Sequence, residues 1–156
     1  MSNDTTGLSE GPVETGPDLI DAPTTETASE QAQRGAEELL LQEGSTETPV
    51  LTVIMPTLNE EEGIAECIER IKAAVVELQV TAEILISDSS TDRTPEIARD
   101  LGAIVVEPDV GGYGSAYKYA VERARGAYIA IGDADTTYDF EELPKLVELV
   151  AEDDVD

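Results

Sequence analysis

The sequence predicts an α/β protein with a mostly parallel, Rossmann-like sheet that has helices on both faces. Three observations support this prediction: short apolar runs alternate with amphipathic segments, the connecting loops are short, and polar residues follow each apolar run. Segments that alternate in this way form parallel sheets covered by helices. In such sheets, ligands bind outside the carboxyl ends of the strands.

Composition limits the classes of function. The chain has 156 residues with 35 acidic and 9 basic side chains, a formal net charge of -26, no histidine and one cysteine. This charge disfavours nucleic-acid binding, because an acidic surface repels phosphate. Without histidine, a bound metal would be a hard ion such as Mg²⁺ or Mn²⁺ held by oxygen atoms. A single cysteine excludes an intrachain disulfide and zinc sites that need two or more cysteines.

The sequence also bears on location and environment. No apolar run reaches the roughly 18 residues of a membrane span, and the N-terminus lacks the basic and apolar regions of a signal peptide. We therefore expect no membrane span in this chain and a cytoplasmic location, with peripheral contact at the cytoplasmic face of the membrane left open. Acidic residues are spread along the chain and 40% of residues are hydrophobic, which favours adaptation to high salt over general disorder.

The first 48 residues differ from the rest. They are rich in Thr, Glu, Ser, Gly and Pro, and they carry eleven acidic side chains with Arg34 as the only base. Such a segment buries too little apolar surface to offset the entropy lost on ordering. We expect a disordered acidic tail over residues 1–48 and a folded domain over residues 49–156. Within the tail, residues 31–42 could form a short helix whose leucines, 39–41, dock on the domain or stay free.

The folded part begins with an apolar run over residues 50–55, typical of a buried parallel strand that Pro56 would end. Asn59, followed three residues later by Glu62, indicates a helix start with an approximate capping box. Apolar residues then recur at spacings of three and four, so this helix should run from about residue 60 to residue 78.

Three more strand–helix pairs follow. Residues 82–87, 103–106 and 128–131 predict strands, and residues 94–101, 115–125 and 140–151 predict the helices after them. Pro95 and Pro144 stand in the first turns of two of these helices, where proline is tolerated. The predicted order is therefore β-α-β-α-β-α-β-α.

Asp133 and Asp135 follow the fourth predicted strand. Two carboxylates so placed can turn toward one point, where they repel each other unless a cation separates them. A hard divalent ion that also binds a diphosphate would remove this repulsion. The alternative is a solvated acidic loop, because chance matches are common in a chain with 35 acidic residues.

Polar side chains also follow the other strands. Thr57, Asn59 and Glu60 offer acceptors after the first strand, although Asn59 could serve only as a helix cap. Asp88 follows the second strand and could accept hydrogen bonds from a nucleobase or a ribose, or could cap the next turn. The glycine loop at 111–114 could hold a phosphate, but no Gly-Lys-Ser/Thr follows it, which excludes a P-loop.

Taken in order, three segments resemble a known family. These are PTLNEEEGI (56–64), ILISDSSTDRT (84–94) and GGYGSAYKYAVERARGAYIAIGDADTTYD (111–139). They resemble the N-terminal half of family 2 glycosyltransferases, which have the GT-A fold, and are most similar to the polyprenyl- or dolichyl-phosphate sugar transferases. The resemblance implies an inverting transfer of a hexose from a GDP- or UDP-sugar to a polyprenyl (dolichyl) phosphate, assisted by Mg²⁺ or Mn²⁺.

The resemblance also implies roles for single residues. Asp133 and Asp135 match the metal-binding pair, with Asp135 as the stronger ligand and the residue assigned to catalysis. Asp88 matches the acidic residue that contacts the base. The full set that the resemblance assigns to the nucleotide sugar is Pro56, Thr57, Asn59, Glu60, Asp88, Gly112 and Asp133.

Some features depart from the family pattern. Thr137 stands where close relatives carry a Gln beside the metal, Ser87 where a second acid is usual, and Arg93 where Gly is frequent, so base preference does not carry over. The sequence stops just after the helix that follows Asp135, so we expect a domain truncated at its C-terminus. One alternative is a nucleotide-binding or regulatory remnant without transferase activity. Another is a Rossmann oxidoreductase, which the absence of G-x-G-x-x-G disfavours.

Overall fold

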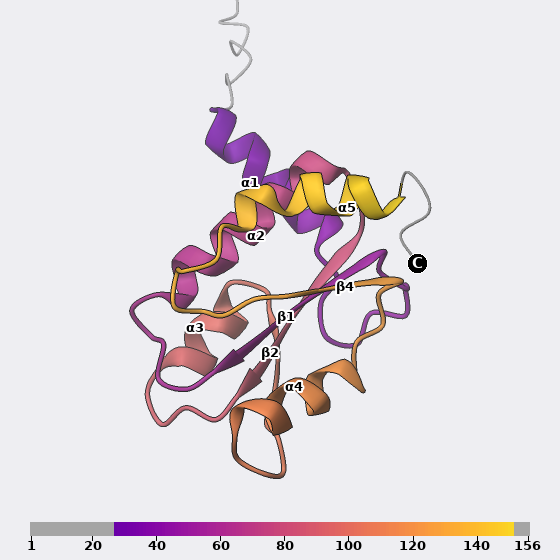
Figure 1. The fold of residues 1–156 in the computed structure, drawn as a ribbon. Helices are drawn as coiled ribbons and strands as arrows, with labels where there is room; N and C mark the ends of the chain where they lie inside the picture. Colours follow the sequence, from indigo (N-terminus) through magenta and orange to yellow (C-terminus); the bar gives the residue numbers. More distant parts are fainter. Residues whose placement is uncertain (1–26, 152–156) are drawn as a thin grey trace, which may run out of the picture.

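The computed structural model describes residues 27–151. Its elements in chain order are α1 (Ala28–Leu39), β1 (Leu51–Thr57), α2 (Ile64–Leu78), β2 (Ala82–Asp88), α3 (Thr94–Asp100), β3 (Ile104–Val106), α4 (Tyr113–Val121), β4 (Tyr128–Ile131), the 3₁₀ helix η1 (Phe140–Glu142) and α5 (Leu143–Ala151) (Figure 1). The four strands form one parallel sheet in the order β3-β2-β1-β4. The predicted alternation is confirmed, with α1 added before it.

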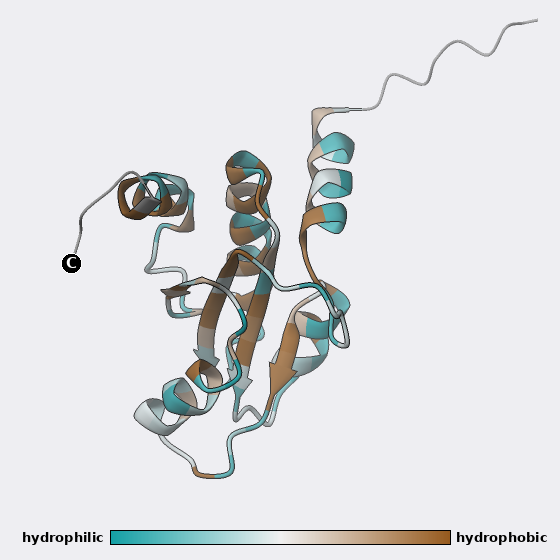
Figure 2. Ribbon diagram, turned by 90° about the vertical axis from the view of Figure 1, so that its right-hand side faces the viewer, coloured by the Kyte–Doolittle hydropathy of each residue, from teal (hydrophilic) through white to brown (hydrophobic). Residues whose placement is uncertain are grey.

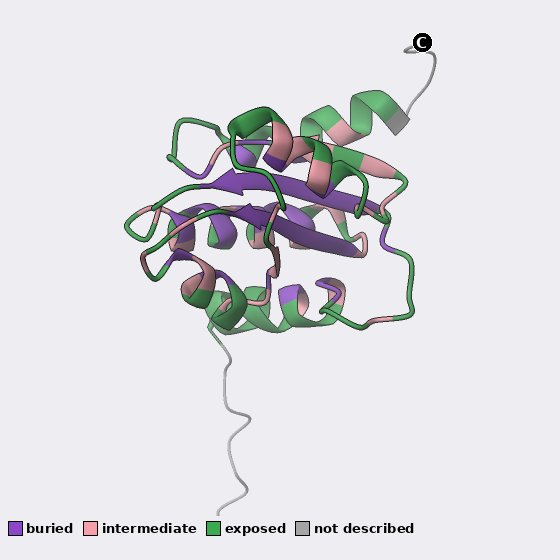
Figure 3. Ribbon diagram, turned by 90° about the horizontal axis from the view of Figure 1, so that it is seen from below, coloured by how far each residue is buried: buried purple, intermediate pink, exposed green. Residues whose placement is uncertain are grey.

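Helices cover both faces of this sheet. On one face Val53 packs with Ile68 of α2, and on the other Ile54 packs with Ala120 of α4. Neighbouring residues of β1 reach different layers because successive side chains in a strand point to opposite faces. β1 and β2 are buried along their whole length (Figure 3). Figure 2 shows these apolar strands beside helices that carry both polar and apolar residues.

α1 and the segment after it belong to the folded part. Thr27 and Glu30 form a complete capping box at the start of α1. Leu40 and Leu41 are 4% and 7% exposed, and the N–H of Leu41 donates to the carbonyl of Ala82 at 2.7 Å. Residues 28–41, which we expected within a disordered tail, instead form α1 and two buried leucines, so the structure supports the alternative in which the leucines dock. The boundary between tail and domain stays a prediction. Residues 1–26 lie outside the described part.

β1 runs two residues further than predicted. Pro56 does not end the pairing, since it lies opposite Ser87 of β2. On the other side, β4 ends at Ile131, opposite Ile54. Alternate residues of a strand direct their hydrogen-bonding groups to the same neighbour, so Pro56 faces the side on which β4 has already ended. The missing N–H of Pro56 therefore costs the sheet no hydrogen bond.

α2 begins four residues later than predicted. Gly63 precedes it, no side chain caps it, and Asn59 adopts φ of 60° instead of forming a capping box with Glu62. The side-chain oxygen of Asn59 accepts from the N–H of Thr91 at 2.9 Å, so Asn59 ties the loop after β1 to the loop after β2. Within residues 27–151, no helix is long and apolar enough to cross a membrane.

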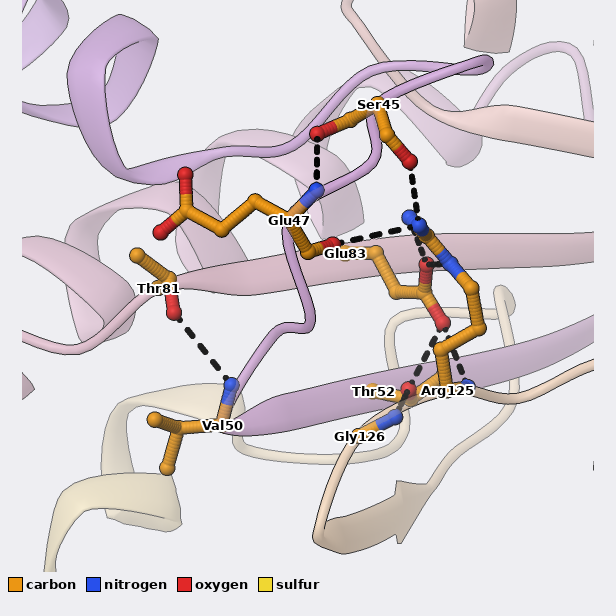
Figure 4. A network of polar contacts seen from close by, with 8 residues as sticks. All are labelled: Ser45, Glu47, Val50, Thr52, Thr81, Glu83, Arg125 and Gly126. Atoms are coloured by element: carbon orange, nitrogen blue, oxygen red, sulfur yellow. Dashed lines mark hydrogen bonds and ion pairs between the residues drawn. The ribbon is translucent and has the colours of Figure 1, made fainter.

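A buried ion pair joins the start of the sheet to the turn before β4 (Figure 4). The side chain of Glu83 is 1% exposed and accepts from Nε of Arg125 at 2.8 Å, from Nη2 at 2.7 Å and from Oγ1 of Thr52 at 2.8 Å. Nη1 of Arg125 also donates to the carbonyls of Ser45 and Glu47, at 2.7 and 3.2 Å. One guanidinium thus joins β2 to the segment that follows α1.

Candidate functional site

A cavity of about 280 Å³ opens at the carboxyl ends of β1 and β4. Its walls come from the loops after β1, β2 and β4 and from the start of α4. The lining residues are Pro56, Thr57, Leu58, Glu60, Ser89, Gly112, Tyr113, Ala116, Asp133, Ala134 and Asp135. A larger cavity of about 550 Å³ lies between α1, α2 and α3, and none of the predicted site residues lines it. The smaller cavity is therefore the candidate site.

The structure brings most of the predicted site residues together. The six that line the cavity are Pro56, Thr57, Glu60, Gly112, Asp133 and Asp135. Asp88 and Asn59 are not among the lining residues. Asn59 braces the two neighbouring loops, as described above, so its contacts support a structural role.

Asp88 lies next to Thr57 and is buried, with 6% exposure. Its Oδ1 accepts from Oγ1 of Thr57 and from Oγ of Ser90, both at 2.6 Å, and its Oδ2 accepts from the N–H of Ser90 at 3.2 Å. These contacts hold the ends of β1 and β2 together. They support the turn-capping alternative, and the role of Asp88 in contacting a base stays a prediction.

Close packing fixes the loop that carries Asp133 and Asp135. A Cβ on Gly132 would lie 2.6 Å from the ring of Phe140, and one on Gly63 would lie 2.9 Å from the carbonyl oxygen of Ala134. Both glycines therefore permit contacts that a larger residue would block. Ala134 is 2% exposed, and Thr136 adopts φ of 63°. Sequence reasoning missed Gly63, which places the start of α2 against this loop.

Asp135 is exposed and held in place by its own turn. Its Oδ1 accepts from the backbone N–H of Thr137 at 3.0 Å. Hydrogen bonds from the side chain and backbone of Thr137 lower the pKa of Asp135, so this carboxylate is charged at neutral pH. Thr137 thus supports Asp135 by hydrogen bonding. This role is compatible with a threonine at the position where close relatives carry a glutamine beside the metal.

Asp133 is held by two tyrosines of α4. Its Oδ1 accepts from the hydroxyls of Tyr113 and Tyr117, which lie one turn apart at the start of α4. Sequence reasoning missed both tyrosines. The available signal was their spacing of four residues, from Tyr113 within the glycine loop to Tyr117 just after it, which places both on one side of a helix.

The carboxylate oxygens that line the cavity fit a hard divalent ion that binds together with a phosphate-containing ligand. Within the described part of the chain, no three carboxylates or cysteines gather into a complete metal site, although Glu60, Asp133 and Asp135 line one cavity. Mg²⁺ commonly takes only one or two protein carboxylates, with water and substrate phosphates completing its shell. Asp133 and Asp135 match that pattern, and they are the residues that would hold such an ion.

Comparison with known proteins gives a consistent family. The glycosyl transferase family 2 profile matches residues 52–156. Over 141 residues the chain is 56% identical to the low-salt glycan biosynthesis hexosyltransferase Agl6 of Haloferax volcanii, covering 88% of this chain and 34% of that protein. Over 100 residues it is 40% identical to a dolichyl-phosphate hexose transferase of the same organism, covering 64% and 42%. The chain thus spans about a third to two fifths of the length of these relatives.

Solved structures agree with this fold. A mannosyltransferase from Pyrobaculum calidifontis in complex with GDP-Man and Mn²⁺ aligns with a TM-score of 0.56 and 28% identity, over 78% of this chain and 38% of that one. Glucosyl-3-phosphoglycerate synthase from Mycobacterium tuberculosis, in complex with Mn²⁺, UDP and glucosyl-3-phosphoglycerate, aligns with a TM-score of 0.57 and 25% identity, over 71% and 46%. The predicted α/β fold, of the GT-A type, is confirmed.

Proposed function

Because the chain belongs to glycosyl transferase family 2, we propose that it binds a nucleoside diphosphate sugar with a divalent ion and takes part in hexose transfer to a polyprenyl (dolichyl) phosphate. The observation that carries this proposal is the cavity at the carboxyl edge of the sheet, with Asp133 and Asp135 on one wall. The names of two relatives, a hexosyltransferase and a dolichyl-phosphate hexose transferase, support the reaction class. An inverting outcome is part of the same proposal.

Asp135 is the proposed principal metal ligand, and its part in catalysis is exerted through the ion. Its charge at neutral pH and its fixed Oδ1 suit this role. When bound, Mg²⁺ or Mn²⁺ would offset the negative charge on the departing nucleoside diphosphate. Mn²⁺ in two related structures supports a divalent ion without deciding between the two metals.

The loop after β1 is proposed to bind the nucleoside end. Pro56 and Thr57 at the end of β1 and Glu60 in the loop after it line the cavity, and Oγ1 of Thr57 donates to Asp88 at 2.6 Å. Gly112 has φ of 115°, and a Cβ placed on it would meet no atom within 4 Å, which leaves room for a phosphate group close to the backbone. GDP and UDP are both candidates, and a cytoplasmic location stays a prediction.

The test is nucleotide binding by the full chain in high salt. Titration calorimetry with GDP and with UDP, in Mn²⁺ or in EDTA, should show binding that requires the metal. Asp135→Ala should weaken metal-dependent binding at least about tenfold, the effect of losing a charged ligand group. Glu141→Ala makes the same change of charge at an exposed residue that does not line the cavity, and it should bind as the parent chain does.

Two results would reject this proposal: equal binding with and without metal, or unchanged binding by Asp135→Ala. The alternative of a nucleotide-binding remnant is separated by a second assay. If the chain binds nucleotide with metal but transfers no hexose to a polyprenyl phosphate, the binding role holds and the transferase role of this chain alone does not.

A further inference from the structure

Two tyrosines meet one carboxylate of the site. Oδ1 of Asp133 lies 2.5 Å from the hydroxyl of Tyr113 and 3.1 Å from that of Tyr117, and the two hydroxyl oxygens are 3.1 Å apart. The rings pack edge to face, with centroids 4.8 Å apart and planes at 79°. The three side chains therefore form one connected group on the wall of the cavity.

The number of hydroxyl protons limits how these three side chains can hydrogen-bond to one another. Each hydroxyl has one proton to donate, while an ionised carboxylate only accepts. Tyr113 donates to Asp133. The single proton of Tyr117 has three acceptors within reach: Oδ1 of Asp133 and the oxygen of Tyr113, both at 3.1 Å, and the carbonyl oxygen of Gly132 at 3.5 Å. A tyrosine hydroxyl stays protonated well above neutral pH, so both remain donors there.

The two tyrosines differ in how firmly they are held. Tyr117 is partly buried and packs against the cluster that Ala120 of α4 forms with Ile54 and Leu85 of the sheet. Tyr113 is 61% exposed and lines the cavity itself. Tyr117 can thus act as the fixed support, while Tyr113 joins the support to the surface that a ligand would contact.

We propose that Tyr113 and Tyr117 are positioning residues that fix Oδ1 of Asp133 and leave Oδ2 for the ligand. This inference rests on the proposed function. In the described part of the chain, no side chain or backbone group donates a hydrogen bond to Oδ2 of Asp133, whereas Oδ1 has two hydroxyl neighbours. The hydroxyl dipoles also offset part of the repulsion between Asp133 and Asp135 before an ion arrives.

The direct test observes Asp133 without any ligand. In the 156-residue chain labelled with ¹³C at the aspartate carboxyl groups, the Asp133 signal is assigned as the one that Asp133→Asn removes. Tyr113→Phe and Tyr117→Phe each remove one hydroxyl and keep the ring, and each should shift that signal. Tyr119→Phe removes a hydroxyl from the same helix, where the ring packs under Arg123, and should leave the signal in place.

The second readout is metal-dependent binding of GDP and UDP. Tyr117→Phe should weaken it about fivefold to tenfold, the size expected for one lost hydrogen bond to a charged and partly exposed group. In a double-mutant cycle, the same change made in an Asp133→Asn background should have much less effect, since the tyrosines act through Asp133. Tyr119→Phe should bind as the parent chain does.

The outcomes separate this inference from the proposed function. An unshifted Asp133 signal in both tyrosine variants overturns the hydrogen-bonded group, whatever the chain binds. A shifted signal with unchanged nucleotide affinity overturns the positioning role but leaves the proposed function standing. Absence of metal-dependent binding in the parent chain rejects both the proposed function and the positioning role, while a shifted signal would still establish the hydrogen bonds.

Discussion

Replacing Arg125 by methionine should destabilise the fold strongly, because it leaves Glu83 charged and buried. Glu83 is 1% exposed, and the guanidinium supplies two of its close contacts, at 2.7 and 2.8 Å. Removing one partner of a buried ion pair typically costs about 3–5 kcal/mol. The Arg125 side chain is 35% exposed, so water screens part of the pair, and we expect a loss of about 2–3 kcal/mol.

The control is an ion pair of the same type at the surface. Arg93 pairs with Glu96 at 3.3 Å, and their side chains are 69% and 62% exposed. Arg93→Met makes the same change of charge and should alter the free energy of unfolding by less than about 0.5 kcal/mol. Urea denaturation in molar KCl measures both variants and keeps the salt concentration constant.

A double variant tests the reasoning further. With Glu83→Gln, the amide oxygen can still accept from Thr52 and from the backbone N–H of residue 125, but its NH₂ group faces the guanidinium. Adding Arg125→Met removes that conflict and leaves no buried charge, so the double variant should lose at least about 1 kcal/mol less than the sum of the single losses. Additive losses, or an Arg125→Met variant as stable as the parent chain, would refute this account of the network.

Two further predictions concern the whole chain. Deleting residues 1–41 should cost more stability than deleting residues 1–26, because Leu40 and Leu41 are buried. Burial of each leucine contributes about 1.5–3 kcal/mol. Equal urea midpoints of the two deletion variants would show that α1 and its leucines do not dock. Folding should require high salt, because the 35 acidic residues outnumber the 9 basic ones and repel one another at a net charge of -26. The screening length falls from about 10 Å at 0.1 M to about 3 Å at 1 M, so the melting temperature should rise with KCl. A melting temperature that is independent of KCl would argue against adaptation to high salt.

The sequence was most informative where periodicity is strong. β4 has its predicted bounds, and α2 ends at Leu78 as predicted. The predicted start of α2 was wrong because the local sequence suggests Asn59 as a helix N-cap. In the fold, the side chain of Asn59 instead accepts a hydrogen bond from Thr91, which is 32 residues away in sequence. Local propensity cannot show that competition, since the partner is supplied by tertiary structure.

The site residues also divide into those that local sequence could predict and those that depend on tertiary contacts. Asp133, Asp135 and Thr57 were predicted from their places after strands, because the topology of a parallel sheet brings strand ends together. Tyr113 and Tyr117 were missed, since an aromatic residue on a helix gives no sign of a hydroxyl partner contributed by another strand end. Glu83 was also missed, because its burial depends on Arg125, which is 42 residues away in sequence.

The charge of the cavity explains why neutral donors and a metal ion would be needed together. Glu60, Asp133 and Asp135 line it, and none of the described lining residues is lysine or arginine. A diphosphate would therefore meet no positively charged side chain among these lining residues, and the carboxylates would repel it unless a cation came with it. A lysine at the place of Tyr113 would pair with Asp133 and compete with the ion for the carboxylate. A tyrosine hydroxyl orients the same carboxylate without neutralising it, so its charge stays available to a divalent ion.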